Sequence, residues 1–164
     1  MTDDRKATVT LQGDRALLIT REFDAPPELV FEAWTKPELV KRWWSAKRGE
    51  VTVAEIDLRV GGAWRWVMVT HEGGIEVAFH GEYREIVPGE RLVSTEAYEG
   101  IPDPDGNASL NTMTLTDIGG RTRMEVLVEH KTPEGRDAQI ASGMEAGMQD
   151  AFDLLEEAAI SLRR

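Results

Sequence analysis

The sequence predicts an α+β fold in which an antiparallel sheet packs against one long carboxy-terminal helix. Strand-like segments with alternating apolar residues fill the middle of the chain, and turn signals separate them. A continuous apolar stripe of helical period fills its last part. With 164 residues, the chain has the length of one domain. We expect that domain to span residues 1–164, with an ordered core from about 15 to 163.

The amino-terminal part predicts one strand followed by two short helices. Apolar residues between positions 15 and 23 indicate the strand. The segment Asp24-Ala25-Pro26-Pro27 ends it and favours a helix start, because proline suits a first helical turn. Trp34 then falls at helical spacing with the apolar residues before it. The segment Thr35-Lys36-Pro37-Glu38 matches a capping box, which predicts that Thr35 caps the second helix.

The middle of the chain predicts about six further strands of an antiparallel meander. Trp64, Trp66 and Met68, for example, occupy every second position of one segment. Gly61-Gly62 lacks the lysine and the strand-to-helix context of a phosphate-binding loop, so we interpret it as a turn. The turn-rich stretch from Glu99 to Asn107 predicts a loop between two strands.

From Thr132-Pro133 to Leu162 the pattern predicts one long helix, with the threonine as its cap. Gly143 and Gly147 lie beside its apolar stripe, and each costs about 1 kcal/mol against alanine inside a helix. We therefore expect a close approach, or a space, beside these glycines. Polar residues on the opposite side are expected to point away from the protein: Glu145, Gln149, Asp153 and Glu156.

Composition excludes several classes of function. The chain carries 30 acidic and 19 basic residues, a net charge of −11 that repels phosphate backbones and argues against nucleic-acid binding. It has no cysteine, and its histidines (His71, His80 and His130) show no converging pattern, so we expect no metal and no cofactor. No apolar run approaches the ~20 residues of a membrane span. Residues 1–6 lack the order of a secretory signal, which favours a cytoplasmic location.

Several motifs occur in a distinctive order: FDAPPELVFEAWT at 23–35, PEL and WW within 37–44, DLR with GG at 57–62, GEYREI at 81–86, ERLV at 90–93 and GRT at 120–122. Together they resemble the domain homologous to the activator of heat-shock protein 90 ATPase, a branch of the START-like superfamily. The resemblance runs from about Leu17 to Leu162. It implies a helix-grip fold, in which a curved antiparallel sheet of about six or seven strands wraps a long carboxy-terminal helix, with two short helices after the first strand. START-like domains commonly place ligands between sheet and helix.

The inward-facing positions of the predicted strands and helix are rich in tryptophan and methionine, which predicts an apolar cavity. Each of these residues would equally fit a solid hydrophobic core without a cavity. The alternation of side chains along their strands allows Glu96 and His130 both to face inward. There they could be polar anchors for a ligand or act as a base. We expect the cavity to be lined by Trp34, Trp44, Trp64, Trp66, Met68, Phe79, Tyr83, Glu96, Met113, Met124, His130, Met144 and Met148.

The leading hypothesis is non-catalytic binding of a small hydrophobic molecule by a monomer or homodimer. One alternative is a co-chaperone-like interaction with heat-shock protein 90, which the family name suggests. Another is an enzyme that acts on a hydrophobic substrate. No serine stands in a Gly-x-Ser-x-Gly setting, and no catalytic residue is assigned.

Overall fold

The computed structural model of the chain describes residues 6–163. Residues 1–5, on which the expected lack of a secretory signal largely rests, lie outside the described residues. The elements follow in the order β1 (Thr8–Gln12), β2 (Ala16–Phe23), α1 (Pro27–Thr35), α2 (Pro37–Trp43), β3 (Gly49–Ile56), β4 (Ala63–Thr70), β5 (Glu76–Val87), β6 (Arg91–Tyr98), the 3-10 turn η1 (Asp105–Asn107), β7 (Ser109–Asp117), β8 (Thr122–Glu129), α3 (Pro133–Ala141) and α4 (Met144–Ile160).

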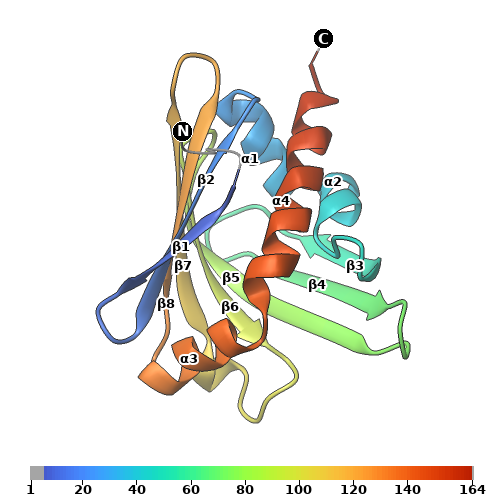
Figure 1. Cartoon of the computed structure of the whole chain (residues 1–164), viewed down its shortest axis with the longest axis vertical. Helices are drawn as coiled ribbons and strands as arrows, with labels where there is room; N and C mark the ends of the chain where they lie inside the picture. The colour runs from blue at the N-terminus through green and yellow to red at the C-terminus, as the bar shows by residue number, and fades with distance from the viewer. Residues whose placement is uncertain (1–5, 164) are drawn as a thin grey trace.

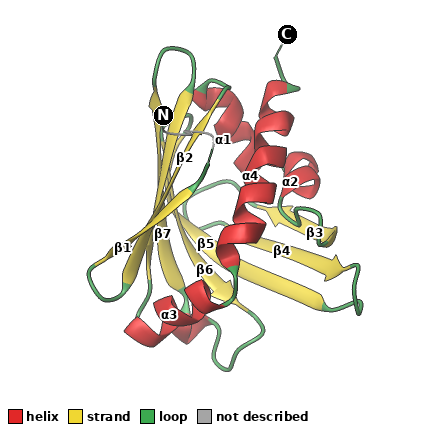
Figure 2. Cartoon of the chain, in the orientation of Figure 1, coloured by secondary structure: helices red, strands yellow, loops and turns green. Residues whose placement is uncertain are grey.

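The strands form one curved antiparallel sheet in the order β1-β2-β8-β7-β6-β5-β4-β3. Helix α4 lies across one face of this sheet, with α1 and α2 at one end and α3 at the other (Figures 1 and 2). The predicted α+β class and helix-grip arrangement are confirmed. The described residues contain eight strands rather than six or seven, because β1 pairs with β2 at the sheet edge. This short edge strand buries little: Leu11 is 56% exposed.

The carboxy-terminal helix is long but shorter than the sequence predicts. The chain forms two helices over the expected span, because Gly143 takes a left-handed backbone conformation (φ 79°) between α3 and α4. Thr132 caps α3 as expected, accepting a hydrogen bond from the Gly135 amide at 3.0 Å. The close approach expected beside the glycines occurs at Gly147, where an added Cβ would lie 2.5 Å from Arg48 Nη2.

The polar flank of α4 does not face away from the protein as the sequence predicts. Asp153 Oδ1 accepts a hydrogen bond from the buried Arg21 of β2 at 2.9 Å. Glu156 accepts one from the Asp24 backbone amide at 2.9 Å. Gln149 exchanges two hydrogen bonds with the Ala7 backbone, at 2.9 and 2.7 Å. The prediction is wrong in that all three residues reach the edge of the curved sheet, although the Asp153 side chain stays 65% exposed.

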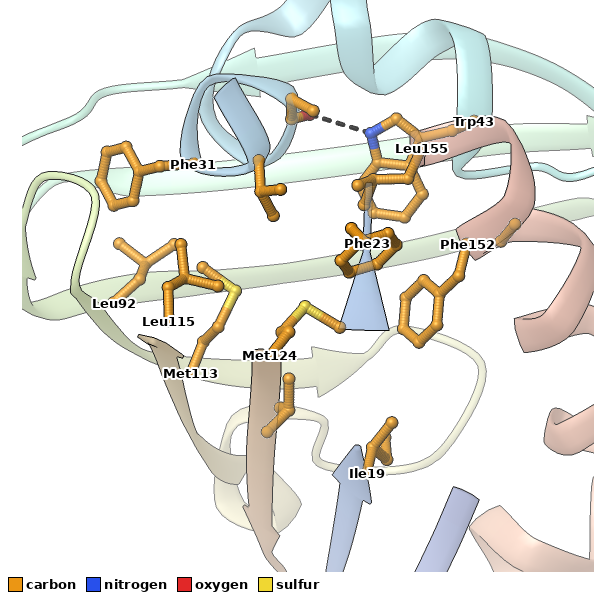
Figure 3. Packing of buried hydrophobic residues seen from close by; sticks show 14 of the residues in the cluster. Ile19, Phe23, Phe31, Trp43, Leu92, Met113, Leu115, Met124, Phe152 and Leu155 are labelled. Carbon is orange, nitrogen blue, oxygen red and sulfur yellow. Dashed lines mark hydrogen bonds between the residues drawn. The ribbon is translucent and has the colours of Figure 1, made fainter. Parts of the chain in front are cut away.

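The junction of α1 and α2 depends on one indole group. In a longer helix the Ala33 carbonyl would accept from residue 37, but Pro37 has no N–H. Trp43 Nε1 instead donates to the Ala33 carbonyl oxygen at 2.8 Å, in a buried setting (Figure 3). The predicted capping box is wrong: only Lys36 separates the helices, and Thr35 ends α1 with its hydroxyl bonded back to the Phe31 carbonyl at 2.8 Å.

The core lies between α4, the two short helices and the concave face of the sheet. Its fully buried side chains include Leu17, Phe23, Val30, Val40, Met124 and Leu155. Phe23 and Phe152 pack edge to face with ring centroids 6.0 Å apart, joining β2 to α4 (Figure 3). No helix within residues 6–163 is both long and apolar enough to cross a membrane.

The Trp43 hydrogen bond leads to a stability prediction. Trp43→Phe should lower the free energy of unfolding by about 2 kcal/mol, since it leaves the buried Ala33 carbonyl without a donor. Trp44→Phe, at the half-buried neighbouring position, is the matched control and should cost less than about 1 kcal/mol. Urea unfolding of both variants measures the difference. Equal losses would contradict the assigned role of the Trp43 indole.

Candidate functional site: a cavity under the helices

A cavity of about 140 Å³ lies between the sheet and the helices. Strands β2, β4, β5, β6, β7 and β8 form its floor and sides, and α1, α3 and α4 each contribute one residue. The lining residues are Ile19, Trp34, Trp64, Trp66, Tyr83, Leu92, Ser94, Glu96, Asn111, Met113, Val126, Val128, Gln139 and Phe152.

The alternation of β-strands explains why these residues share one space. Leu92, Ser94 and Glu96 are successive inward positions of β6, because side chains of a strand alternate between its two faces. The neighbouring strand pairs Ser94 with Asn111, which brings a second polar side chain to the same part of the floor. The cavity is therefore lined by polar side chains where β6 and β7 meet, and mainly by apolar ones elsewhere.

Trp66 stands at the centre of the apolar wall. Its ring contacts the rings of all four other tryptophans, with centroid distances of 6.3 Å to Trp34, 5.9 Å to Trp43, 5.6 Å to Trp44 and 5.1 Å to Trp64. Phe152 of α4 extends the cluster and lies 6.2 Å from Trp34. The cluster ties α1, α2 and α4 to β4 and forms a rigid aromatic surface over the cavity.

The indole N–H groups of Trp34 and Trp66 are buried and have no hydrogen-bond partner among the described residues. Neither nitrogen is accessible to water, so neither can donate to a molecule in the cavity as the side chains stand. Both rings contact Trp43 at steep angles, 66° and 86°. Such edge-on contacts are a favoured arrangement of aromatic rings.

Glu96 is the only carboxyl group among the lining residues. Burial raises the pKa of Glu96, and a hydrogen bond with the Asn111 side chain opposes this effect. Asn111 is itself fixed by Ser109, whose hydroxyl donates to Asn111 Oδ1 at 2.9 Å. Burial also raises the pKa of Tyr83, which keeps its phenol neutral. The polar end of the cavity thus holds one weakly solvated carboxyl group and neutral hydrogen-bonding groups.

Helix α3 closes this end of the cavity with a single side chain. Gln139 lines the cavity, and its Oε1 lies 2.5 Å from His130 Nε2 at the end of β8. The helix buries no residue fully. Arg136 fixes it further by donating to the Gly13 carbonyl at 2.8 Å. Polar contacts therefore help to hold α3 in place, together with Ile140, which packs against the core.

Six of the residues expected at the cavity line it: Trp34, Trp64, Trp66, Tyr83, Glu96 and Met113. The others lie elsewhere. Trp44 and Phe79 pack edge to face with ring centroids 5.8 Å apart, and Met124 is fully buried in the core. His130 reaches the site only through Gln139. Met68, Met144 and Met148 do not line the cavity either, because matching parity does not specify where along the sheet the helices cross it.

Eight lining residues were not predicted from the sequence: Ile19, Leu92, Ser94, Asn111, Val126, Val128, Gln139 and Phe152. Strand parity was a usable signal for several of them. Leu92 and Ser94 share the parity of Glu96, and Asn111 shares that of Met113. Gln139 gave no such signal, because its place depends on the break between α3 and α4.

Comparison with known proteins shows the family to which the chain belongs. Residues 24–159 match the model of the family "Activator of Hsp90 ATPase homolog 1-like protein". The chain belongs to this family. The comparison with curated proteins finds no match.

Solved structures of bacterial proteins share the fold of this family member over nearly its whole length. A protein from Rhodobacter sphaeroides is 29% identical, with a TM-score of 0.85 over 96% of this chain and 100% of that one. One from Nitrosomonas europaea is 26% identical, with a TM-score of 0.79 over 92% and 97% of the two chains. One from Chromobacterium violaceum is 27% identical, with a TM-score of 0.76 over 88% and 96%.

A second polar cluster of this protein lies outside the cavity. His80 of β5 stands between two carboxylates, with Nδ1 2.8 Å from Glu99 and Nε2 2.5 Å from Asp105. Asp105 and Glu99 raise the pKa of His80 above its ordinary value of 6.5. Arg65 donates two hydrogen bonds to Glu99, each 2.9 Å long, and lowers the pKa of Glu99 to about 2. This His80 cluster fixes the loop between β6 and β7 to the sheet.

The His80 cluster predicts a pH dependence of stability. Because the folded pKa of His80 is raised, its stabilisation is present below the unfolded value of 6.5 and is lost as the pH rises through the folded value. His80→Gln should destabilise the protein by up to about 1 kcal/mol at pH ~6 and by much less at pH ~9. Denaturant unfolding across this range measures the effect. His71→Gln, in an exposed turn, is the control. A His80→Gln penalty that does not change with pH would contradict the assignment.

Proposed function

We propose that the protein binds a small hydrophobic molecule, without chemical conversion, in the cavity between the sheet and the helices. The cavity itself carries the proposal. A volume of about 140 Å³ is several times the ~30 Å³ share of one water molecule, and is close to that of an apolar cavity of about 150 Å³ that binds benzene. Its walls are mainly aromatic and aliphatic, as is usual for small-molecule sites.

The chemistry of the lining favours binding over catalysis. Within the described part of the chain, Tyr83 and Glu96 are the only ionisable side chains that line the cavity. Burial raises the pKa of both, which disfavours their charged forms. The lining residues do not include a nucleophile paired with a base that activates it, as covalent catalysis requires. Family membership agrees with this proposal, because START-like domains commonly hold hydrophobic ligands.

Blocking the cavity tests the proposal. Benzene at about 100 times its dissociation constant should stabilise the parent by about 2.7 kcal/mol, seen as a rise in melting temperature. Val126→Phe places a ring in the cavity from β8 and should abolish this rise. Leu127→Phe, the next residue of the same strand with its side chain on the opposite face, is the matched control and should keep it. Equal responses of both variants, or no response of the parent, would overturn the proposal.

A further inference from the structure

The carboxyl group of Glu96 has no cationic partner among residues 6–163. Among the lining residues there is no lysine, arginine or histidine, and the ion pairs of residues 6–163 do not include Glu96. A carboxylate offers about four acceptor positions, and the Asn111 side chain accounts for one hydrogen bond. Glu96 is half-buried, and a carboxyl group with so few partners provides an unmet interaction at the polar end of the cavity.

The surroundings of this carboxyl group disfavour an anion and offer an aromatic surface to the rest of a ligand. Trp34, Trp64 and Trp66 line the cavity, and their large rings can pack against an apolar body. The chain as a whole carries a net charge of −11, which raises the local concentration of cations and lowers that of anions. An anionic ligand would meet Glu96 with no basic residue to compensate.

The size of the cavity restricts the ligand further. A volume of about 140 Å³ suits a molecule of roughly the size of benzene. Such a molecule has room for one polar group at the Glu96 end and a short apolar body against Trp66 and Phe152. A long acyl chain or a fused ring system exceeds this volume.

We propose that the ligand is a small organic amine, bound with its ammonium group on Glu96 and its apolar body against the aromatic wall. This inference rests on the proposed function and specifies the chemical class of the ligand. When the ammonium ion enters while Glu96 is protonated, Glu96 gives its proton to solvent and the ion pair forms. In that case binding of the amine releases a proton, whereas binding of a neutral alcohol of the same shape does not.

Calorimetric titration with three probes of equal heavy-atom count tests the inference: cyclopentylamine, cyclopentanol and methylcyclopentane. Cyclopentylamine should bind the parent at least about tenfold more tightly than cyclopentanol, as expected for a hydrogen bond to a charged group. This measurement needs no variant and remains decisive if a substitution impairs folding.

Glu96→Gln keeps the shape of the side chain and removes its charge. It should weaken cyclopentylamine binding about tenfold and leave methylcyclopentane binding unchanged. Glu125→Gln is the matched control, because Glu125 lies between the inward-facing Met124 and Val126 of β8 and so faces the other side of the sheet. It should leave binding of all three probes unchanged.

The outcomes separate the two proposals. A preference for the amine that Glu96→Gln removes supports the amine assignment. Binding of all three probes with similar affinity, or tightest binding of cyclopentanol, overturns the amine assignment and leaves the proposed function standing. Binding of none of the probes overturns both.

Discussion

The contacts of Trp66 are the constraint on which the rest of the structure depends. This one side chain of β4 meets the other four tryptophans, and through them it links both short helices to the sheet. Phe152 joins the same cluster from α4. Because the rings are large and rigid, they set the distance between the helices and the sheet. The helices cannot settle more deeply without displacing the cluster.

The cavity follows from this fixed distance. Beside the tryptophans, the sheet presents shorter side chains on β6, β7 and β8, among them Ser94, Asn111 and Val126. These side chains extend less far from the sheet than the tryptophan rings do, so they leave a space below the helices. Helix α3, held by Arg136 and by the contact of Gln139 with His130, closes the end that remains. The same cluster therefore stabilises the fold and preserves the space beneath it.

Strand alternation and the motif order predicted the fold class, the two short helices and the inward parity of Trp64, Trp66 and Glu96. Strand alternation can be predicted from neighbouring residues alone, and the motif order is shared by the whole family. The break at Gly143 was not predicted, because a glycine beside an apolar stripe is equally compatible with close packing and with a left-handed turn. Gln149, Asp153 and Glu156 were misplaced for a related reason. Helical periodicity shows which residues are polar but not that a curved sheet edge reaches them.

The cavity lining could be predicted only in part, since parity assigns a face of the sheet and not a position along it. Xenon tests the central claim most directly, because it enters dry apolar cavities of this size and is visible by its anomalous scattering. In a crystal pressurised with xenon, we expect a peak beside Trp66, Phe152 and Val126. No peak there, with ordered waters throughout the cavity or with side chains collapsed into it, would contradict the account.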